Sequence, residues 1–211
     1  MEDARSYLIA TAPATEGLFK LLNSYGWAKM RALVELTKSR TREELEEHKE
    51  SFSSTDVARE VIAGSILQIA YVALSRYAVP SGKSTNALHF ASEINRLIRE
   101  NPSTRTKGPF SLPDKFCVGR EIGHLPMGML IYAGRNQYNH FGEERLSVVN
   151  EVVFNHLHAV WPSPPNGLTF DLYKEKRIHS YSILAALGWN DSEQEMGYST
   201  YKRDMSDLLH I

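Results

Sequence analysis

Apolar residues recur along this chain at steps of three and four, and the alternation of apolar and polar residues typical of strands is almost absent. Between residues 15 and 37 this helical spacing is carried by Leu18, Leu21, Leu22, Tyr25, Met30, Leu33, Val34 and Leu36. Gly26 is expected to kink or divide that helix, because glycine weakens a helix interior. The pattern predicts an all-α protein built as a helical bundle.

Residues 41–51 are charged almost throughout, which predicts a short solvated helix. The run Ser53-Ser54-Thr55-Asp56 then supplies N-cap side chains for a separate long helix. Its apolar positions are Val57, Val61, Ile62, Ile66, Leu67, Ile69, Val72 and Leu74. Residues 80–82 end it, and a helix of about 17 residues follows from Ser84 to the Asn101-Pro102 pair. Two long helices joined by a tight turn are expected to pack antiparallel.

Prolines and glycines are spread along residues 101–125, which predicts a long loop. Six basic residues and two acidic ones lie between Arg96 and Arg120, so positive charge is locally in excess. Solvated lysines and arginines in a loop explain this excess as well as a binding role does. Arg120 is nevertheless placed among the residues expected to bind substrate.

Pro126 is well placed to begin the next helix, because its missing N–H costs nothing in a first turn. The apolar segment 127–132 of that helix could supply contact surface between two copies, but a Met-rich helical stripe is more often core, and core is the favoured interpretation. A further helix is predicted at residues 143–161, a break at 162–167, and two short helices in the last 50 residues. These elements predict a single domain over residues 1–211. It has N-terminal helices at 1–50, a bundle core at about 55–161 and a C-terminal helical extension at 162–211.

Composition adds constraints on location and cofactors. The chain has 211 residues and a formal net charge of −1, so any site for a polyanion must be local. Cys117 is the single cysteine, which excludes a disulfide framework or a thiolate metal cluster within one chain. The first residues are acidic, and no apolar run approaches the ~20 residues that span a bilayer. We expect a cytoplasmic protein without membrane contact, metal or cofactor.

One short segment concentrates the polar chemistry of the chain. With about 100° per helical residue, four side chains share one arc of about 140°: Arg135, Asn136, Asn139 and His140. Glu143 lies in the middle of that arc one turn later. A fixed cation, a group that titrates near neutrality and two amides are suited to binding and cleaving a phosphodiester.

The spacing of Arg135 and His140, with a polar Asn136 directly after the arginine and helices on both sides, resembles the HEPN superfamily. In the ribonuclease branch of that family the motif is an arginine, four to six residues and then a histidine. The resemblance covers residues 55–161 and leaves both ends unassigned. The pairs Arg42–His48 and Arg203–His210 also fit the loose spacing, but they lie in a charged surface helix and at the C-terminus.

The resemblance implies metal-independent cleavage of RNA, in which the ribose 2′-hydroxyl attacks the adjacent phosphorus and expels the 5′-oxygen. His140 would move protons, Arg135 would bind phosphate oxygens, and Asn136 would orient the phosphate or the imidazole. Residues expected to assist substrate binding are Asn139, Tyr138, Glu143 and Arg120. Family members commonly dimerise with their motifs facing across one cleft, so RNA and a second copy are the expected partners.

The resemblance also allows a toxin or defence effector with a protein inhibitor. A non-catalytic helical domain that dimerises or docks a partner remains the alternative. In that case the same residues serve structure.

Overall fold

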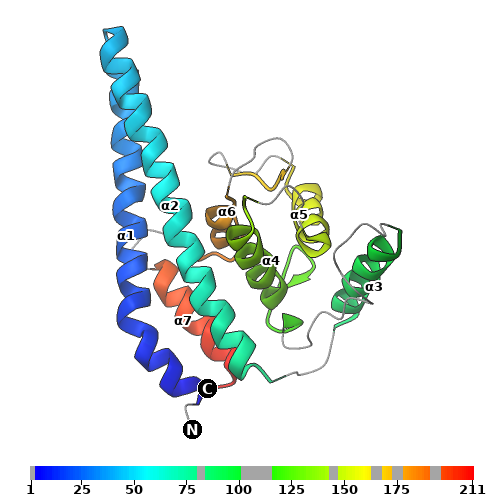
Figure 1. The fold of residues 1–211 in the computed structure, drawn as a ribbon. Helices are drawn as coiled ribbons and strands as arrows, with labels where there is room; N and C mark the ends of the chain where they lie inside the picture. The colour runs from blue at the N-terminus through cyan, green and yellow to red at the C-terminus, as the bar shows by residue number, and fades with distance from the viewer. Residues whose placement is uncertain are drawn as a thin grey trace.

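The computed structural model describes residues 3–79, 84–100, 116–142, 147–162, 168–172, 178–190 and 196–211. Seven helices and one two-stranded hairpin make up the regular structure of these ranges. The prediction of an all-α bundle is therefore confirmed. Its longest elements are α1 (Ala4–Lys38) and α2 (Arg42–Tyr77), an antiparallel pair whose upper end projects beyond the rest of the molecule (Figure 1).

Both long helices begin at residues that satisfy the unpaired N–H groups of a first turn. Asp3 caps α1 by accepting a hydrogen bond from the Ser6 N–H at 2.7 Å. Thr41 and Glu44 form a capping box at the start of α2, in which each side chain accepts from the other residue's backbone N–H. The three residues between the helices therefore reverse the chain tightly.

Two predicted interruptions of these helices are wrong. The charged segment at 41–51 and the apolar segment after Asp56 form one continuous α2, so the expected boundary near residue 50 falls inside a helix. Ser54 and Thr55 donate their hydroxyls back to the Ser51 carbonyl, at 3.0 and 2.7 Å, instead of capping a new helix. Helix α1 also continues past Gly26 without division.

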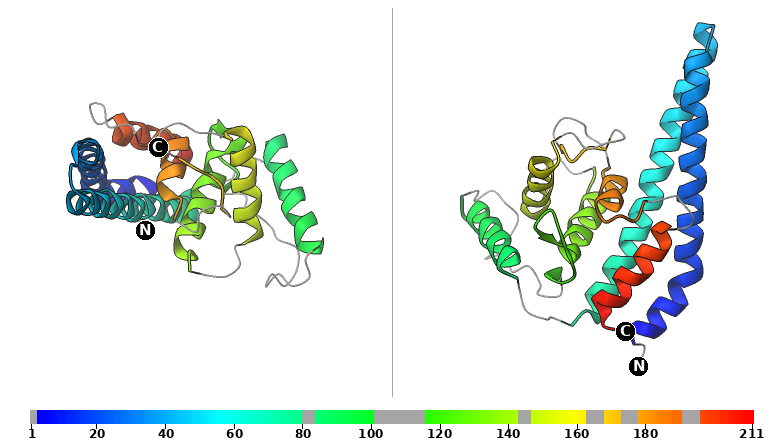
Figure 2. Two further views of the ribbon diagram at one scale, coloured as in Figure 1. Left: turned by 90° about the horizontal axis from the view of Figure 1, so that it is seen from above. Right: turned by 180° about the vertical axis from the view of Figure 1, so that it is seen from behind.

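The remaining helices stand beside the lower part of this pair (Figure 2). Helix α4 (Met127–Asn139) packs against α2 and is flanked by α5 (Val148–Val160) and α6 (Ser180–Ala186). Helix α3 (Thr85–Glu100) lies outermost, against α5. Helix α7 (Met196–Leu209) returns to α1 and α2. The expected antiparallel packing of α2 against α3 is replaced by contacts of α2 with α1 and α4.

A short β-hairpin leads into α4. Strands β1 (Glu121–Ile122) and β2 (Leu125–Pro126) pair antiparallel, and Gly123 between them has a positive φ of 56°. In α4, Met127, Met129, Leu130 and Ile131 are buried, which confirms the expectation that this segment is core. The start of α4 is thus enclosed, while its other end carries the polar motif.

Helix α2 also bears on location. Among the described residues, α2 is the one helix that is both long enough and apolar enough to cross a membrane. Of its most apolar 18-residue window, 44% is buried inside the fold. The core helix of a soluble protein passes the same test of length and composition, so one such helix is weak evidence for a membrane span. The structure is therefore compatible with a soluble protein.

Candidate active site at the C-terminal end of α4

The motif occupies about the last turn and a half of α4 and its C-cap. The helix ends at Asn139, and His140 is the cap residue, whose backbone N–H donates to the Asn136 carbonyl at 3.0 Å. The last carbonyls of a helix carry partial negative charge, which favours cationic side chains at this end. His140 lies at this end of the helix as its cap residue, whereas Arg135 lies more than one turn before it.

Arg135 is half-buried and is held by side chains of α2. Its Nε donates to Gln68 Oε1 at 3.0 Å, and its guanidinium carbon lies 4.5 Å from the centroid of the Tyr71 ring. Its Nη1 also donates to Asn136 Oδ1 at 3.1 Å. Arg135 therefore lies between an amide and an aromatic face, with its fork oriented by two hydrogen bonds.

Asn139 completes the cluster, and the orientation of its amide follows from the chemistry of Arg135. A guanidinium can only donate hydrogen bonds, so the amide oxygen must face it. In that orientation Asn139 Oδ1 accepts from Arg135 Nε at 2.8 Å and from Nη2 at 3.1 Å. The opposite orientation would give one bond of 3.3 Å from Asn139 Nδ2 to Gln68 and leave two donors facing each other. We adopt the first orientation.

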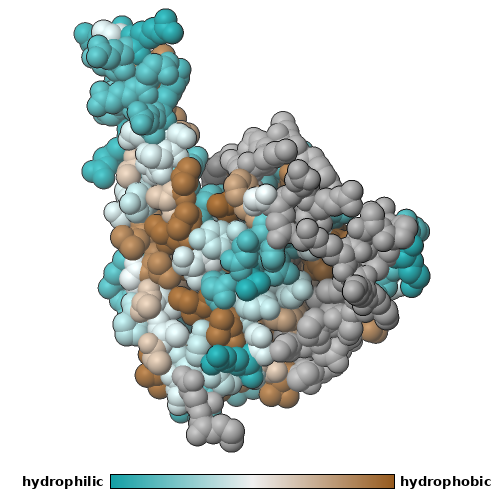
Figure 3. Space-filling view, in the orientation of Figure 1, coloured by the Kyte–Doolittle hydropathy of each residue, from teal (hydrophilic) through white to brown (hydrophobic). Residues whose placement is uncertain are grey.

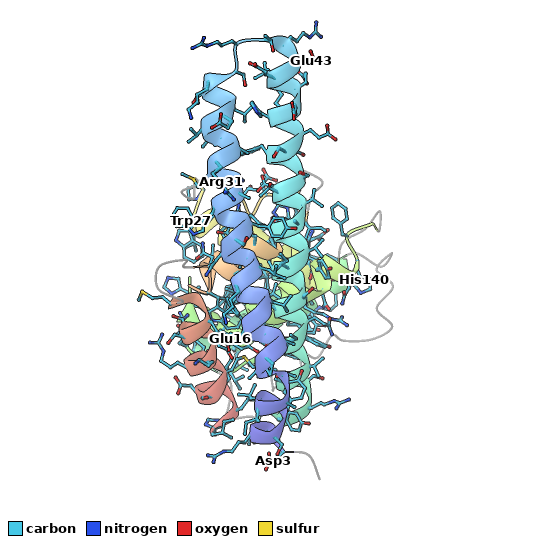
Figure 4. All side chains as sticks on the ribbon, turned by 90° about the vertical axis from the view of Figure 1, so that its left-hand side faces the viewer. Asp3, Glu16, Trp27, Arg31, Glu43 and His140 are labelled. Atoms are coloured by element: carbon cyan, nitrogen blue, oxygen red, sulfur yellow. The ribbon has the colours of Figure 1, made fainter. Side chains whose placement is uncertain are left out.

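His140 is exposed at the end of α4, one residue after Asn139. Figure 4 shows it at one edge of the molecule, on the side of the α1–α2 pair opposite α7. Asn136 is half-buried and bridges the backbone of His140 to the side chain of Arg135. The two groups with the strongest chemistry are thus accessible and not sealed beneath apolar side chains.

Other residues of the motif hold the helix in place. Gln137 is buried, and its Oε1 accepts from the His179 backbone N–H at 3.0 Å. The ring of Tyr138 lies over Gly64 of α2, where an added Cβ would come within 2.4 Å of the Tyr138 Cδ2. Glycine at position 64 is what lets the ring approach the helix. The ring of Tyr138, which was expected to bind substrate, therefore packs against α2.

The structure does not bring Arg120 to this cluster. Arg120 lies at the opposite end of α4, where its carbonyl accepts from the Met127 N–H at 3.0 Å. Its guanidinium bonds both carboxylate oxygens of Asp204 and, at 2.6 Å, the Leu187 carbonyl. The sequence expectation that Arg120 assists the motif is therefore not supported by its position. Glu143, the other expected substrate contact, lies outside the described residues.

Gln68 and Tyr71 are site residues that the sequence reading missed. Gln68 interrupts an otherwise apolar stretch of α2, and that isolated polar residue was the available signal. On α2 it shares one face with Val57 and Val61, since the three positions lie within about 40° of each other at about 100° per residue. Val57 and Val61 are 60% and 43% exposed. We call this pair the α2 stripe.

The α2 stripe runs along the projecting hairpin toward Gln68 and hence toward the cluster. Figure 3 shows apolar side chains gathered along the α1–α2 pair on the face toward the viewer. Exposed apolar groups beside a polar cluster are typical of a protein contact surface. Within the described ranges, no three His, Cys, Asp or Glu side chains group as metal ligands.

Comparison of the chain with protein-family models, with curated proteins and with solved structures gives no match.

Proposed function

We propose that this chain is a HEPN-type, metal-independent endoribonuclease that works as a homodimer in the cytoplasm. The supporting observation is that Arg135 is oriented by the neutral groups of Gln68, Asn136 and Asn139. The exposed His140 directly follows Asn139 on the same helix end. The described contacts of Arg135 include no carboxylate. None of these described partners neutralises the guanidinium, which supports a role for Arg135 in binding phosphate.

The proposed chemistry uses the nucleophile of RNA itself. The 2′-hydroxyl loses its proton and its oxygen bonds to the adjacent phosphorus, while the bond from phosphorus to the 5′-oxygen breaks. The departing oxygen takes a proton, leaving a 2′,3′-cyclic phosphate and a 5′-hydroxyl. His140 of one copy removes the first proton and His140 of the other delivers the second. Arg135 neutralises the charge that builds on the equatorial phosphate oxygens.

Dimerisation supplies the second set of groups. In the proposed dimer the α2 stripes of two copies meet beside their α4 ends, so that two copies of the motif line one cleft. Two arginines then bind one phosphodiester, although each chain carries a formal net charge of only −1. Val57→Glu and Val61→Glu are each expected to give a monomer in analytical ultracentrifugation and to abolish cleavage.

The decisive experiment is cleavage of single-stranded and hairpin RNA in the presence of EDTA. Wild-type protein should produce cyclic-phosphate ends, while Arg135→Ala and His140→Ala should each lose at least about 100-fold in rate. Arg203→Ala and His210→Ala are matched controls, because both residues are exposed and repeat the arginine-to-histidine spacing elsewhere. Equal losses in the control variants, or wild-type protein that cleaves neither RNA, would rule the proposal out.

A non-catalytic dimerisation or docking domain is the second candidate. It is favoured by the number of intramolecular partners that Arg135 has, because a packing arginine makes contacts of the same kind. In that case wild-type protein dimerises but is inactive, and Arg135→Ala lowers stability without another effect. A protein inhibitor and a role as a toxin or defence effector belong only to the first candidate.

A further inference from the structure

Four large apolar side chains are exposed on one face of α1, in the projecting part of the hairpin. Trp27 is 65% exposed, Met30 56%, and Leu33 and Val34 44% each. At about 100° per residue they share an arc of about 120°. We call these four residues the α1 stripe. Large apolar groups gathered on one helix face, with a tryptophan among them, are typical of a protein-binding surface.

The α1 stripe is remote from the candidate active site. Figure 4 shows Trp27 and Arg31 at the edge of the hairpin that also carries α7, whereas His140 lies at the opposite edge. A partner bound to the α1 stripe therefore leaves the cluster around Arg135 open. Binding at the α1 stripe is therefore independent of the proposed ribonuclease activity.

The lower part of the same α1 face is already covered by a helix. Phe19 lies within about 20° of Met30 around the helix axis. Its ring contacts Tyr198 and Tyr201 of α7, with 5.5 Å between ring centroids in each case. Helix α7 begins at Met196, and in Figure 2 no described element covers this face above it. The α1 stripe thus continues a surface on which this fold seats a helix.

Gly26 lies inside the α1 stripe, within about 40° of Met30. A Cβ at this position would meet nothing within 4 Å, so no neighbour in the chain requires a glycine there. Glycine in a helix interior is destabilising relative to alanine. The missing side chain of Gly26 lets another backbone approach α1 closely, as a helix packed directly on α1 would need.

The hairpin is held rigid at this level. Lys29 of α1 forms an ion pair with Asp56 of α2, and its ammonium lies 4.6 Å from the centroid of the Phe52 ring. Arg59 bonds the same carboxylate at 3.3 Å and lies 3.8 Å from the centroid of the Tyr181 ring of α6. These contacts fix the spacing of α1 and α2, so the surface is formed before a partner arrives.

Basic side chains follow the outer edge of the α1 stripe. Lys20, Arg31 and Lys38 lie about 80–100° from Met30, on the side away from α2. Lys20 and Lys38 pair with Glu16 and Glu35 of their own helix, but all four of these side chains are at least 41% exposed. Exposed pairs of this kind are weak and yield to a competing carboxylate. Arg31 has no ion pair among the described residues.

We propose that the α1 stripe binds an amphipathic helix of a partner protein in line with α7. The apolar face of that helix covers Trp27, Met30, Leu33 and Val34, its backbone crosses at Gly26, and its acidic residues face Arg31 and Lys38. From Gly26 to Thr37 the surface spans about 17 Å, so a helix of about 12 residues fills it. The partner is therefore an acidic amphipathic helix and not a second copy of this basic-edged surface.

The test uses two designed helical peptides with the same leucine face, one flanked by glutamates and one by lysines. Fluorescence anisotropy of labelled peptide should show that the full chain binds the glutamate peptide at least tenfold more tightly than the lysine peptide. Met30→Glu should weaken binding at least tenfold. Leu88→Glu should not, since Leu88 is 54% exposed but lies on α3. Equal binding of the two peptides, or binding of neither, overturns the proposal.

Glycine variants separate docking from folding. Gly17 and Gly26 both lie in α1, and a Cβ meets nothing within 4 Å at either. Gly17→Ala and Gly26→Ala should therefore raise the melting temperature similarly. Only Gly26→Ala should weaken binding of the glutamate peptide. Self-association that rises with concentration and is lost in Met30→Glu would instead make the partner a second copy and contradict the proposal.

Discussion

Arg120 and Arg135 lie at opposite ends of α4 and have partners of opposite kind. Arg120 bonds the carboxylate of Asp204, whose side chain is 3% exposed and also accepts from Trp189 Nε1 at 2.8 Å. Arg135 bonds the amides of Gln68, Asn136 and Asn139 and lies over Tyr71. The first arginine is neutralised within the fold, whereas the second has no carboxylate partner among the residues that the structure describes.

The difference separates a structural arginine from a candidate functional one. Asp204 and the Leu187 carbonyl tie Arg120 to α7 and to the end of α6, and Asp204 also accepts from Trp189. Amide oxygens orient a guanidinium without cancelling its charge, whereas a carboxylate does both. An arginine that is oriented but not neutralised is prepared for an external anion.

The largest expected effect comes from replacing each arginine by lysine. Lysine keeps the charge but loses the planar fork that can bond two phosphate oxygens. In the RNA cleavage assay, Arg135→Lys should lower kcat/KM by about 100-fold. Arg120→Lys should leave kcat/KM within about twofold of wild type, because its partner is inside the fold. A similar loss in both variants would contradict the distinction between the two arginines.

Stability should depend more on the partner of Arg120 than on the partner of Arg135, the reverse of the order expected for activity. Asp204→Ala removes the acceptor of both Arg120 and the buried Trp189 N–H, which should lower the free energy of unfolding by about 2 kcal/mol. Most of that cost comes from Trp189, since the side chain of Arg120 is 45% exposed and can be solvated. Gln68→Ala should cost less than about 1 kcal/mol in the same urea titration. A larger loss for Gln68→Ala would place Arg135 among the structural residues.

The sequence was sufficient to locate a helix and its polar face where the start signal and the apolar pattern lie within that helix. Pro126 and the apolar run after it located α4, and helical geometry placed Arg135, Asn136 and Asn139 on one arc. The contacts of Arg135 with both amides agree with that arc. The error at residues 51–56 arose because Ser54 and Thr55 have the chemistry of caps, and only the continuous packing of α2 decides that they bond within the helix.

Partners distant in sequence could not be predicted. Gln68 is 67 residues from Arg135, and Asp204 is 84 residues from Arg120. The first pairing depends on how α2 packs against α4, and the second on where α7 lies relative to the residues before β1. A single sequence carries no periodic signal for either. The sequence singled out both arginines for one site, and it could not show that Arg120 is bonded elsewhere. The charge of their partners, which separates the two roles, required the fold.

A single substitution should make Arg135 resemble Arg120. Gln68→Glu keeps the size of the side chain and replaces the amide by a carboxylate, which pairs with Arg135 and competes with phosphate. We expect the KM for RNA to rise about tenfold, since each tenfold change corresponds to about 1.4 kcal/mol of binding. Unfolding stability should stay equal or increase. Gln68→Met is the control for loss of the hydrogen bond alone, and an unchanged KM in Gln68→Glu would show that Arg135 does not bind the substrate.

The smallest expected effect concerns the ring beneath Arg135. Tyr71→Leu removes the aromatic face but keeps an apolar side chain, so Arg135 loses about 0.5–1 kcal/mol of cation–π attraction. That energy corresponds to a decrease of about threefold in kcat/KM. Tyr71→Phe keeps the ring and should retain wild-type activity. The ring also contacts Phe116, 5.2 Å away between centroids. Stability must therefore be measured alongside, and a loss of activity in Tyr71→Phe equal to that in Tyr71→Leu would assign the effect to the hydroxyl.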